Sequence, residues 1–124
     1  MSGCESEMFR WMNDSRASGG IAPLSSDGRI LNIARSWSDR MAEIQSLEHN
    51  PNYGNQIFSA VPESRRAGEN VGRTTGSNRG LYDGFMASSG HRAKIMGAEY
   101  SHAVVGCTVD AGGQLWVTMN FWGA

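Results

Sequence analysis

The sequence lacks the apolar run of about 20 residues that a membrane-spanning helix requires. It also lacks an excess of charge of either sign, because 11 basic and 12 acidic residues leave a formal net charge of −1. A balanced, interspersed charge offers no basic surface to nucleic acid or to an anionic membrane. We therefore expect no transmembrane segment and no nucleic-acid partner.

The first residues lack the basic stretch and apolar core of a secretion signal. Either the protein is cytosolic, or a signal has been removed. Ser2, Gly3 and Cys4 also resemble the end of a lipobox, a motif in which Cys4 would carry lipid. A helix is expected to begin at once, without a tether, and this counts against lipidation.

Several catalytic motifs are missing as well. The sequence contains no His-Glu-x-x-His, no Gly-x-Ser-x-Gly, no phosphate-binding glycine loop and no Cys-x-x-Cys, so the chemistries of those motifs are excluded. Only two cysteines occur, Cys4 and Cys107. They are either two separate buried thiols or one disulfide, which would close a loop of about 100 residues and stabilise the fold by about 4–5 kcal/mol.

What the sequence does contain is enough for one compact domain. Its 124 residues, 40% of them hydrophobic, place it near the usual size of a single domain. A chain of this length buries roughly two-thirds of its unfolded surface. We expect one domain over residues 1–124, monomeric, that needs no cofactor to fold.

The apolar pattern predicts helices first and strands last. A first helix carries Cys4, Met8, Trp11 and Met12 on one stripe and ends at residues 18–20. A second helix, capped within residues 25–27, has an apolar stripe over four turns: Ile30, Ile33, Ala34, Trp37, Met41 and Ile44. Further helical turns are expected around residues 81–86 and 91–96.

From His102 the apolar period changes to two, which is typical of strands. A tight turn at residues 111–113 is expected to join two strands into an antiparallel hairpin, and residues 69–71 are expected to begin a further strand. The fold class is therefore α+β. The predicted core contains Ile30, Ile33, Trp37, Met41, Val105, Val117, Met119 and Phe121, and the inner face of the first hairpin strand contains Ala103, Val105, Cys107 and Val109.

Polar residues whose side chains can act as ligands, acids or bases lie in three separate segments, at residues 47–51, 67–71 and 88–96. These hold His49, Glu69 and His91, two imidazoles and a carboxylate that only the fold can bring together. Each lies at a break between regular elements, where a polar group can reach the rim of a layer. His102, at the start of a strand, is expected to be an exposed residue outside this group.

These segments, followed by a strand reading Trp-Val-Thr-x-Asn-Phe, resemble the CAP superfamily of cysteine-rich secretory, antigen 5 and pathogenesis-related 1 proteins, and above all its bacterial SCP-like branch. The resemblance covers about residues 5–122. It implies a three-layer α-β-α sandwich with a small antiparallel sheet that ends in a C-terminal hairpin. It also implies a secreted or cell-envelope-exposed protein with a central cleft.

The resemblance assigns His49, Glu69 and His91 to three places of a cleft tetrad of two histidines and two acids. The fourth place, three residues after a Trp in eukaryotic members, holds Ser88 here, and Phe85 replaces the Trp. The loss of one carboxylate weakens the case for acid-dependent catalysis. Ser88 is expected to cap the helical turn of His91 rather than act as a nucleophile.

Two imidazoles and a carboxylate can form a half-open site for zinc or a similar divalent ion, with His49 and His91 as ligands and Glu69 orienting a ring or a bound water. The alternative is structural, with Glu69 accepting hydrogen bonds from a histidine or from backbone amides. We expect a secreted binding module whose cleft takes a divalent ion and a small-molecule or cell-envelope ligand. The other possibilities are an extracellular interaction protein with a vestigial cleft and a metal-assisted hydrolase; the enzyme is disfavoured because no nucleophile with an adjacent base is evident.

Overall fold

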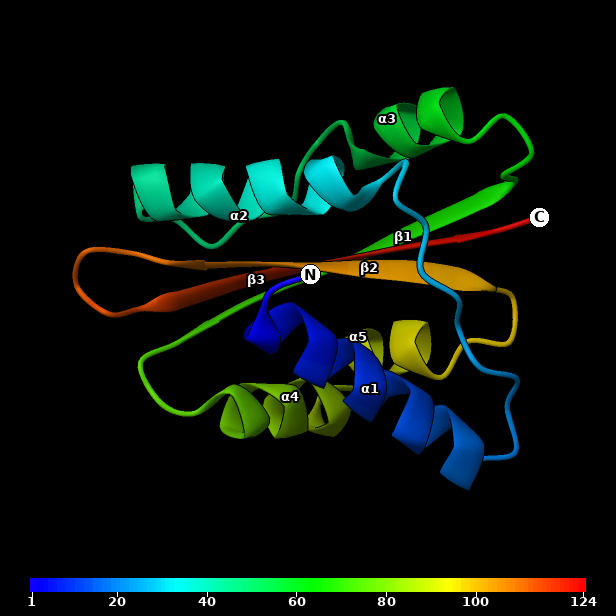
Figure 1. Ribbon diagram of the computed structural model, residues 1–124, viewed down its shortest axis with the longest axis horizontal. Helices are drawn as coiled ribbons and strands as arrows, with labels where there is room; N and C mark the ends of the chain where they lie inside the picture. The colour runs from blue at the N-terminus through cyan, green and yellow to red at the C-terminus, as the bar shows by residue number, and fades with distance from the viewer.

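The computed structural model describes residues 1–124 and is a three-layer α-β-α sandwich, as predicted (Figure 1). Helices α2 and α3 cover one face of the sheet, and helices α1, α4 and α5 cover the other (Figure 1). No helix is long and apolar enough to cross a membrane. The elements follow the chain in this order: α1 Gly3–Ser18, α2 Leu31–Ile44, α3 Tyr53–Ala60, β1 Arg66–Thr74, α4 Asn78–Ala87, α5 Ser89–Ile95, β2 His102–Val109 and β3 Leu115–Gly123.

The sheet has three antiparallel strands in the order β1-β3-β2. Every residue of the central strand β3 is buried, because helices cover both of its faces. Val117, Met119 and Phe121 face the core on the side of α1, α4 and α5, whereas Trp116 and Trp122 belong to clusters on the α2 and α3 side. Strand alternation in β3 therefore supplies both halves of the core.

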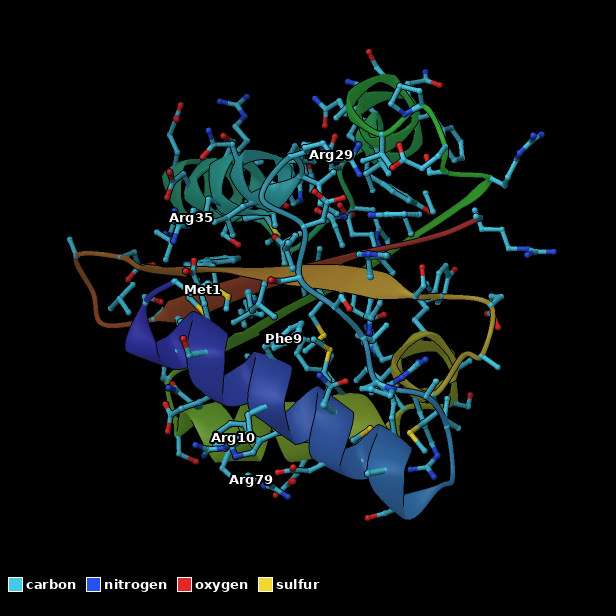
Figure 2. The ribbon with its side chains drawn as sticks, turned by 45° about the vertical axis from the view of Figure 1, so that its right-hand side comes forward. Met1, Phe9, Arg10, Arg29, Arg35 and Arg79 are labelled. Atoms are coloured by element: carbon cyan, nitrogen blue, oxygen red, sulfur yellow. A yellow bond between two sulfur atoms is a disulfide. The ribbon has the colours of Figure 1, made fainter.

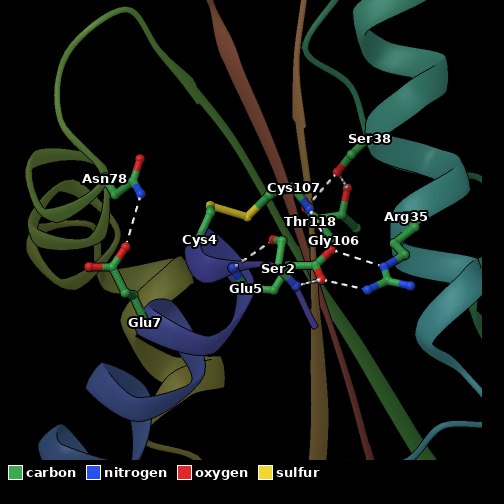
Figure 3. The surroundings of a disulfide bond; sticks show 10 residues. All are labelled: Ser2, Cys4, Glu5, Glu7, Arg35, Ser38, Asn78, Gly106, Cys107 and Thr118. Atoms are coloured by element: carbon green, nitrogen blue, oxygen red, sulfur yellow. Dashed lines mark hydrogen bonds and ion pairs between the residues drawn. A yellow bond between two sulfur atoms is a disulfide. The ribbon is translucent and has the colours of Figure 1, made fainter.

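Helix α1 begins and ends as the sequence predicts. Ser2 and Glu5 form a capping box, and the helix ends before Gly19 and Gly20, the latter at φ +71°. Cys4 of α1 forms a disulfide with Cys107 of β2, with the two Cα atoms 6.4 Å apart (Figure 3). The two cysteines therefore form one disulfide rather than two separate buried thiols. The sulfur of Cys4 is not available for lipid, and the lipobox hypothesis is wrong.

The Glu5 carboxylate beside the disulfide joins three elements (Figure 3). It is buried, accepts hydrogen bonds from Arg35 of α2 at 2.8 and 3.1 Å, and accepts one from the Cys107 N–H at 3.2 Å. A buried carboxylate is tolerated only with such partners. The first turn of α1 is thus fixed against both the sheet and the opposite helical layer.

The start of α2 differs from the prediction. The helix begins at Leu31, and its N-cap residue, Ile30, makes no side-chain cap. Ser25 instead pairs with His102 in an isolated β-bridge, and the Asp27 carboxylate accepts hydrogen bonds from Arg29 and from Trp122 Nε1. Tertiary partners thus outcompete the local cap that residues 25–27 offer.

The predicted core is confirmed except on the outer side of α2. Six of its residues are buried: Ile30, Met41, Val105, Val117, Met119 and Phe121. Ile33 and Trp37 are only partly buried, because they face the gap between α2 and α3 rather than the sheet. Val109, at the end of β2, is 66% exposed, since the strand there extends past the helices.

Two element boundaries also differ. The hairpin connection runs from Asp110 to Gln114 rather than over residues 111–113 alone, with Gly113 at φ +83°. The Asp110 carboxylate closes it by accepting hydrogen bonds from the backbone N–H groups of Gly112 and Gln114. Strand β1 begins at Arg66, three residues before the predicted start, because its whole length pairs with β3.

Candidate functional site

Glu69 is the centre of the candidate site. It lies on β1 directly opposite Asn120 of β3, and its side chain is completely buried. Both carboxylate oxygens accept hydrogen bonds: Oε1 from the Asn50 backbone N–H at 2.8 Å, and Oε2 from Asn120 Nδ2 at 3.2 Å. A third partner, His49 Nδ1, lies 3.0 Å from Oε1. These bonds compensate for burying the charge.

The pairing with Glu69 determines which nitrogen His49 offers to solvent. Because both oxygens of Glu69 already accept hydrogen bonds, Nδ1 is the nitrogen that donates its proton to the carboxylate. The other nitrogen, Nε2, makes no hydrogen bond within the protein, and the His49 side chain is 58% exposed. In the neutral ring, Nε2 therefore carries a lone pair that a ligand can reach.

Asn50 holds the loop that carries His49. Its side-chain oxygen accepts a hydrogen bond from the Asn52 N–H at 2.9 Å, and its Nδ2 donates to Gln56 Oε1 at 2.8 Å. The residue is buried, unlike its neighbour His49. Sequence reasoning did not identify Asn50 or Asn120 as site residues. The Asn50-Pro51 pair, which favours a turn, was the available signal for the first.

His91 and Ser88 form the second half of the site. The His91 Nδ1 lies 2.8 Å from Ser88 Oγ, and the imidazole packs edge-on against Phe85 with ring centroids 5.2 Å apart. Ser88 occupies the N-cap position of α5, yet its side chain makes no cap hydrogen bond. The predicted capping role is therefore wrong, because the hydroxyl is engaged by the imidazole instead.

The surroundings of His91 favour its neutral form. Burial lowers the pKa of His91 below its ordinary value, the charges of Lys94 and His49 lower it further, and the backbone of Val71 acts in the opposite direction. Asn70, which follows Glu69 on β1, donates through Nδ2 to the His91 carbonyl at 3.0 Å and so joins α5 to the same strand.

The four residues assigned to the cleft form two hydrogen-bonded pairs, His49 with Glu69 and His91 with Ser88. That the two pairs share one cleft stays a prediction. His102 lies outside them, as predicted. It is not freely exposed, however, because it stacks on Trp122 with ring centroids 4.0 Å apart and planes 5° apart.

The donor set does not fit a resident metal ion. Zinc sites use at least three protein ligands, and no group of three or more His, Cys, Asp or Glu side chains is placed to hold one. Both Glu69 oxygens accept protein hydrogen bonds, and His91 Nδ1 is bonded to Ser88. A divalent ion between His49 and His91 remains a prediction that would need its other ligands from water or a bound molecule.

The sequence of the chain is similar to that of a known bacterial protein. The chain is 28% identical over 127 residues to the uncharacterized protein YkwD of Bacillus subtilis, a match that covers 99% of this chain and 48% of YkwD. The chain thus spans about half the length of this curated relative.

Solved structures show the same fold. An extracellular protein containing an SCP domain from Bacillus anthracis superposes with a TM-score of 0.85 at 21% identity, over 98% of this chain and 41% of that one. An outer surface protein of Borrelia burgdorferi gives a TM-score of 0.85 at 9% identity, over 95% of this chain and 90% of that one. The model of the CAP family, described as the cysteine-rich secretory protein family, matches residues 9–121. The chain therefore belongs to the CAP family.

Proposed function

We propose that the chain is a secreted or envelope-exposed binding module whose cleft, formed by His49, Glu69, Ser88 and His91, takes a small ligand. The observation that carries this proposal is the full hydrogen bonding of the buried Glu69 carboxylate. A carboxylate with its oxygens occupied by protein donors orients an imidazole rather than activating water. The extracellular and outer-surface relatives support the location.

In this role His49 would recognise the ligand through Nε2, held in one tautomer by Glu69. His91, kept neutral by burial, would present an uncharged ring. A ligand that donates a hydrogen bond fits the free Nε2 of His49, whereas His91 already contacts Ser88 and the Val71 backbone through its ring. The preference for such a ligand would follow from Ser88, which stands where eukaryotic members of the family carry the second acid of the cleft.

A hydrolase is the second candidate, and one observation favours it. Ser88 Oγ lies 2.8 Å from the nitrogen of a neutral imidazole, which is the distance between a nucleophile and its general base. Sequence reasoning missed this pair because the three-residue spacing also fits a helix cap. We rank it second because no carboxylate orients the His91 ring.

The two candidates predict different behaviour with isolated Gram-positive cell envelopes. A binding module should sediment with the envelopes and release no soluble fragments over time. His49→Gln should weaken this sedimentation, whereas His102→Gln, which alters a histidine outside the cleft, should not. Steady release of fragments by the unchanged protein, abolished by Ser88→Ala, would replace the binding function with hydrolysis.

A further inference from the structure

A second polar site lies away from the four cleft residues, between helices α2 and α3. It is a groove of about 820 Å³, within the range of roughly 300–1,000 Å³ that ligand sites occupy. Five of the eleven Asn and Gln residues of the chain line it. Asn32 and Ser36 project from α2, and Asn55 and Ser59 from α3, each pair four residues apart on one helical face.

The polar side chains of the groove are available to a ligand. Asn32, Ser36, Asn55 and Ser59 are exposed and make no side-chain hydrogen bond within the protein. Gln56 accepts from Asn50 through Oε1, so its NH₂ group remains a donor. The groove thus presents amides and hydroxyls that both donate and accept hydrogen bonds.

The charges around the groove are already neutralised. Arg29, which Figure 2 labels beside the start of α2, makes ion pairs with Asp27 and Glu63 at 3.0 and 2.9 Å. Arg40 pairs with Glu43 at 2.9 Å. No carboxylate lines the groove. Its electrostatics therefore favour neither an anionic nor a cationic ligand.

One aromatic side chain in the groove is held rigidly. Trp37 donates through Nε1 to the Glu48 carbonyl at 2.8 Å and packs against the cluster of Met41, Val71 and Trp116. The indole is only partly buried, and it lines the groove. A fixed aromatic surface costs little entropy when a ligand packs on it. Only three of the twelve lining residues are hydrophobic, too few for a lipid or an amphipathic helix.

We propose that this groove binds an uncharged oligosaccharide. Sugar hydroxyls donate and accept hydrogen bonds and so match amide and hydroxyl side chains, while the C–H face of a sugar ring can pack on Trp37. An extended peptide fits less well, because the groove walls are helices whose backbone groups are already hydrogen-bonded and cannot pair with a strand. This binding site is separate from the proposed cleft. The two are linked only through Asn50, which hydrogen-bonds Glu69 of the cleft and Gln56 of the groove.

The test is calorimetric titration of the full chain with three soluble probes: cellohexaose, chitohexaose and maltohexaose. At least one should bind, and Asn55→Ala and Ser59→Ala should each weaken its binding by roughly fivefold, the effect of one lost hydrogen bond. Both residues are exposed and unbonded, so folding should be unaffected, as thermal unfolding will verify. Ser6→Ala, on α1 in the opposite layer, alters an exposed residue that likewise makes no side-chain hydrogen bond, so it is the matched control and should bind normally.

A second variant separates this proposal from the cleft function. His49→Gln should bind the oligosaccharide with unchanged affinity, because the groove residues do not include His49. The proposal is overturned if none of the three probes binds at millimolar concentration. It is also overturned if binding survives in the Asn55→Ala, Ser59→Ala double variant, or if a charged heparin fragment or an uncharged peptide binds more tightly than every neutral sugar.

Discussion

Glu69 shows how one buried carboxylate can position a loop that lies 20 residues away in sequence. Its bonds to the Asn50 N–H and to His49 fix the segment between α2 and α3, and its bond to Asn120 ties that segment to the central strand. The sequence predicted that Glu69 belongs to the site. It could not predict the partners, because hydrogen bonds between distant segments leave no periodic pattern.

Replacing Glu69 tests whether these bonds hold the loop. Glu69→Ala leaves the buried Asn50 N–H and Asn120 amide without an acceptor, which costs about 1–3 kcal/mol for each unsatisfied group. We expect urea unfolding to show a fall of roughly 2–5 kcal/mol in the free energy of unfolding. Glu69→Gln keeps an acceptor and should lose less. Equal losses for the two variants would show that neither the shape of the side chain nor a single retained acceptor is enough, and that the role of Glu69 requires the full carboxylate.

His91 should make stability depend on pH near neutrality. Its pKa is lowered in the folded protein, chiefly by burial, so the unfolded chain binds the proton more readily. The free energy of unfolding should therefore fall as the pH drops from about 7.5 through the unfolded value of about 6.5. Urea midpoints at pH 7.5 and 5.5 should differ less in His91→Gln than in the unchanged protein. An identical pH dependence in both would contradict the assignment.

The predicted divalent site depends on the two cleft imidazoles. If zinc bridges them, calorimetric titration should show binding that His49→Gln and His91→Gln each remove, and that weakens as the pH falls, because a protonated imidazole cannot coordinate a metal ion. His102→Gln is the control, since its ring stacks on Trp122 outside the site. Zinc binding that persists in both cleft variants would place the ion elsewhere.

At the scale of whole elements, the sequence predicts best where the pattern is long and local. Helix α1 carries both its cap and its glycine stop, and the β2–β3 hairpin carries two strands of alternating residues. The start of α2 was misplaced because the capping signal at residues 25–27 is used by β2 and Trp122 instead. The role of Ser88 was predicted wrongly for a similar reason. A helix-capping serine and a serine that hydrogen-bonds a histidine can both lie three residues before their partner, so the spacing to His91 does not distinguish them.

The disulfide joins the first turn of α1 to β2 across 103 residues of chain. Such a bond restricts the unfolded chain, and a loop of about 100 residues is worth about 4–5 kcal/mol. Cys4→Ser combined with Cys107→Ser should lower the free energy of unfolding by about this amount, measured against the oxidised protein. The Glu5–Arg35 contact remains in that variant and should keep α1 docked. A loss below about 1 kcal/mol would mean that the loop is already constrained when unfolded.

The whole molecule depends on how closely the α2 layer approaches the sheet. A Cβ added to Gly106 of β2 would lie 2.5 Å from the backbone of Ala34 and Arg35, and Ser38 of the same helix donates to the Gly106 carbonyl at 2.8 Å. Only glycine allows this contact, so the distance between α2 and the sheet depends on the absence of a side chain at Gly106. The alternating pattern of β2 could not predict this close approach, because alternation indicates which face of the sheet a residue lies on and not how near a helix packs to it.

Gly106→Ala should therefore push α2 away from the sheet and lower the free energy of unfolding by about 1–3 kcal/mol, as overpacking in a dense core does. Gly84→Ala is the matched control, because nothing lies within 4 Å of the added Cβ and Gly84 sits inside helix α4. There the substitution should be neutral or slightly stabilising, since alanine favours the helix. Because Asn32 and Trp37 move with α2, Gly106→Ala should also weaken binding in the groove, whereas Gly84→Ala should not. Equal stability of the two variants would show that α2 can shift without cost and that its distance from the sheet does not determine the fold.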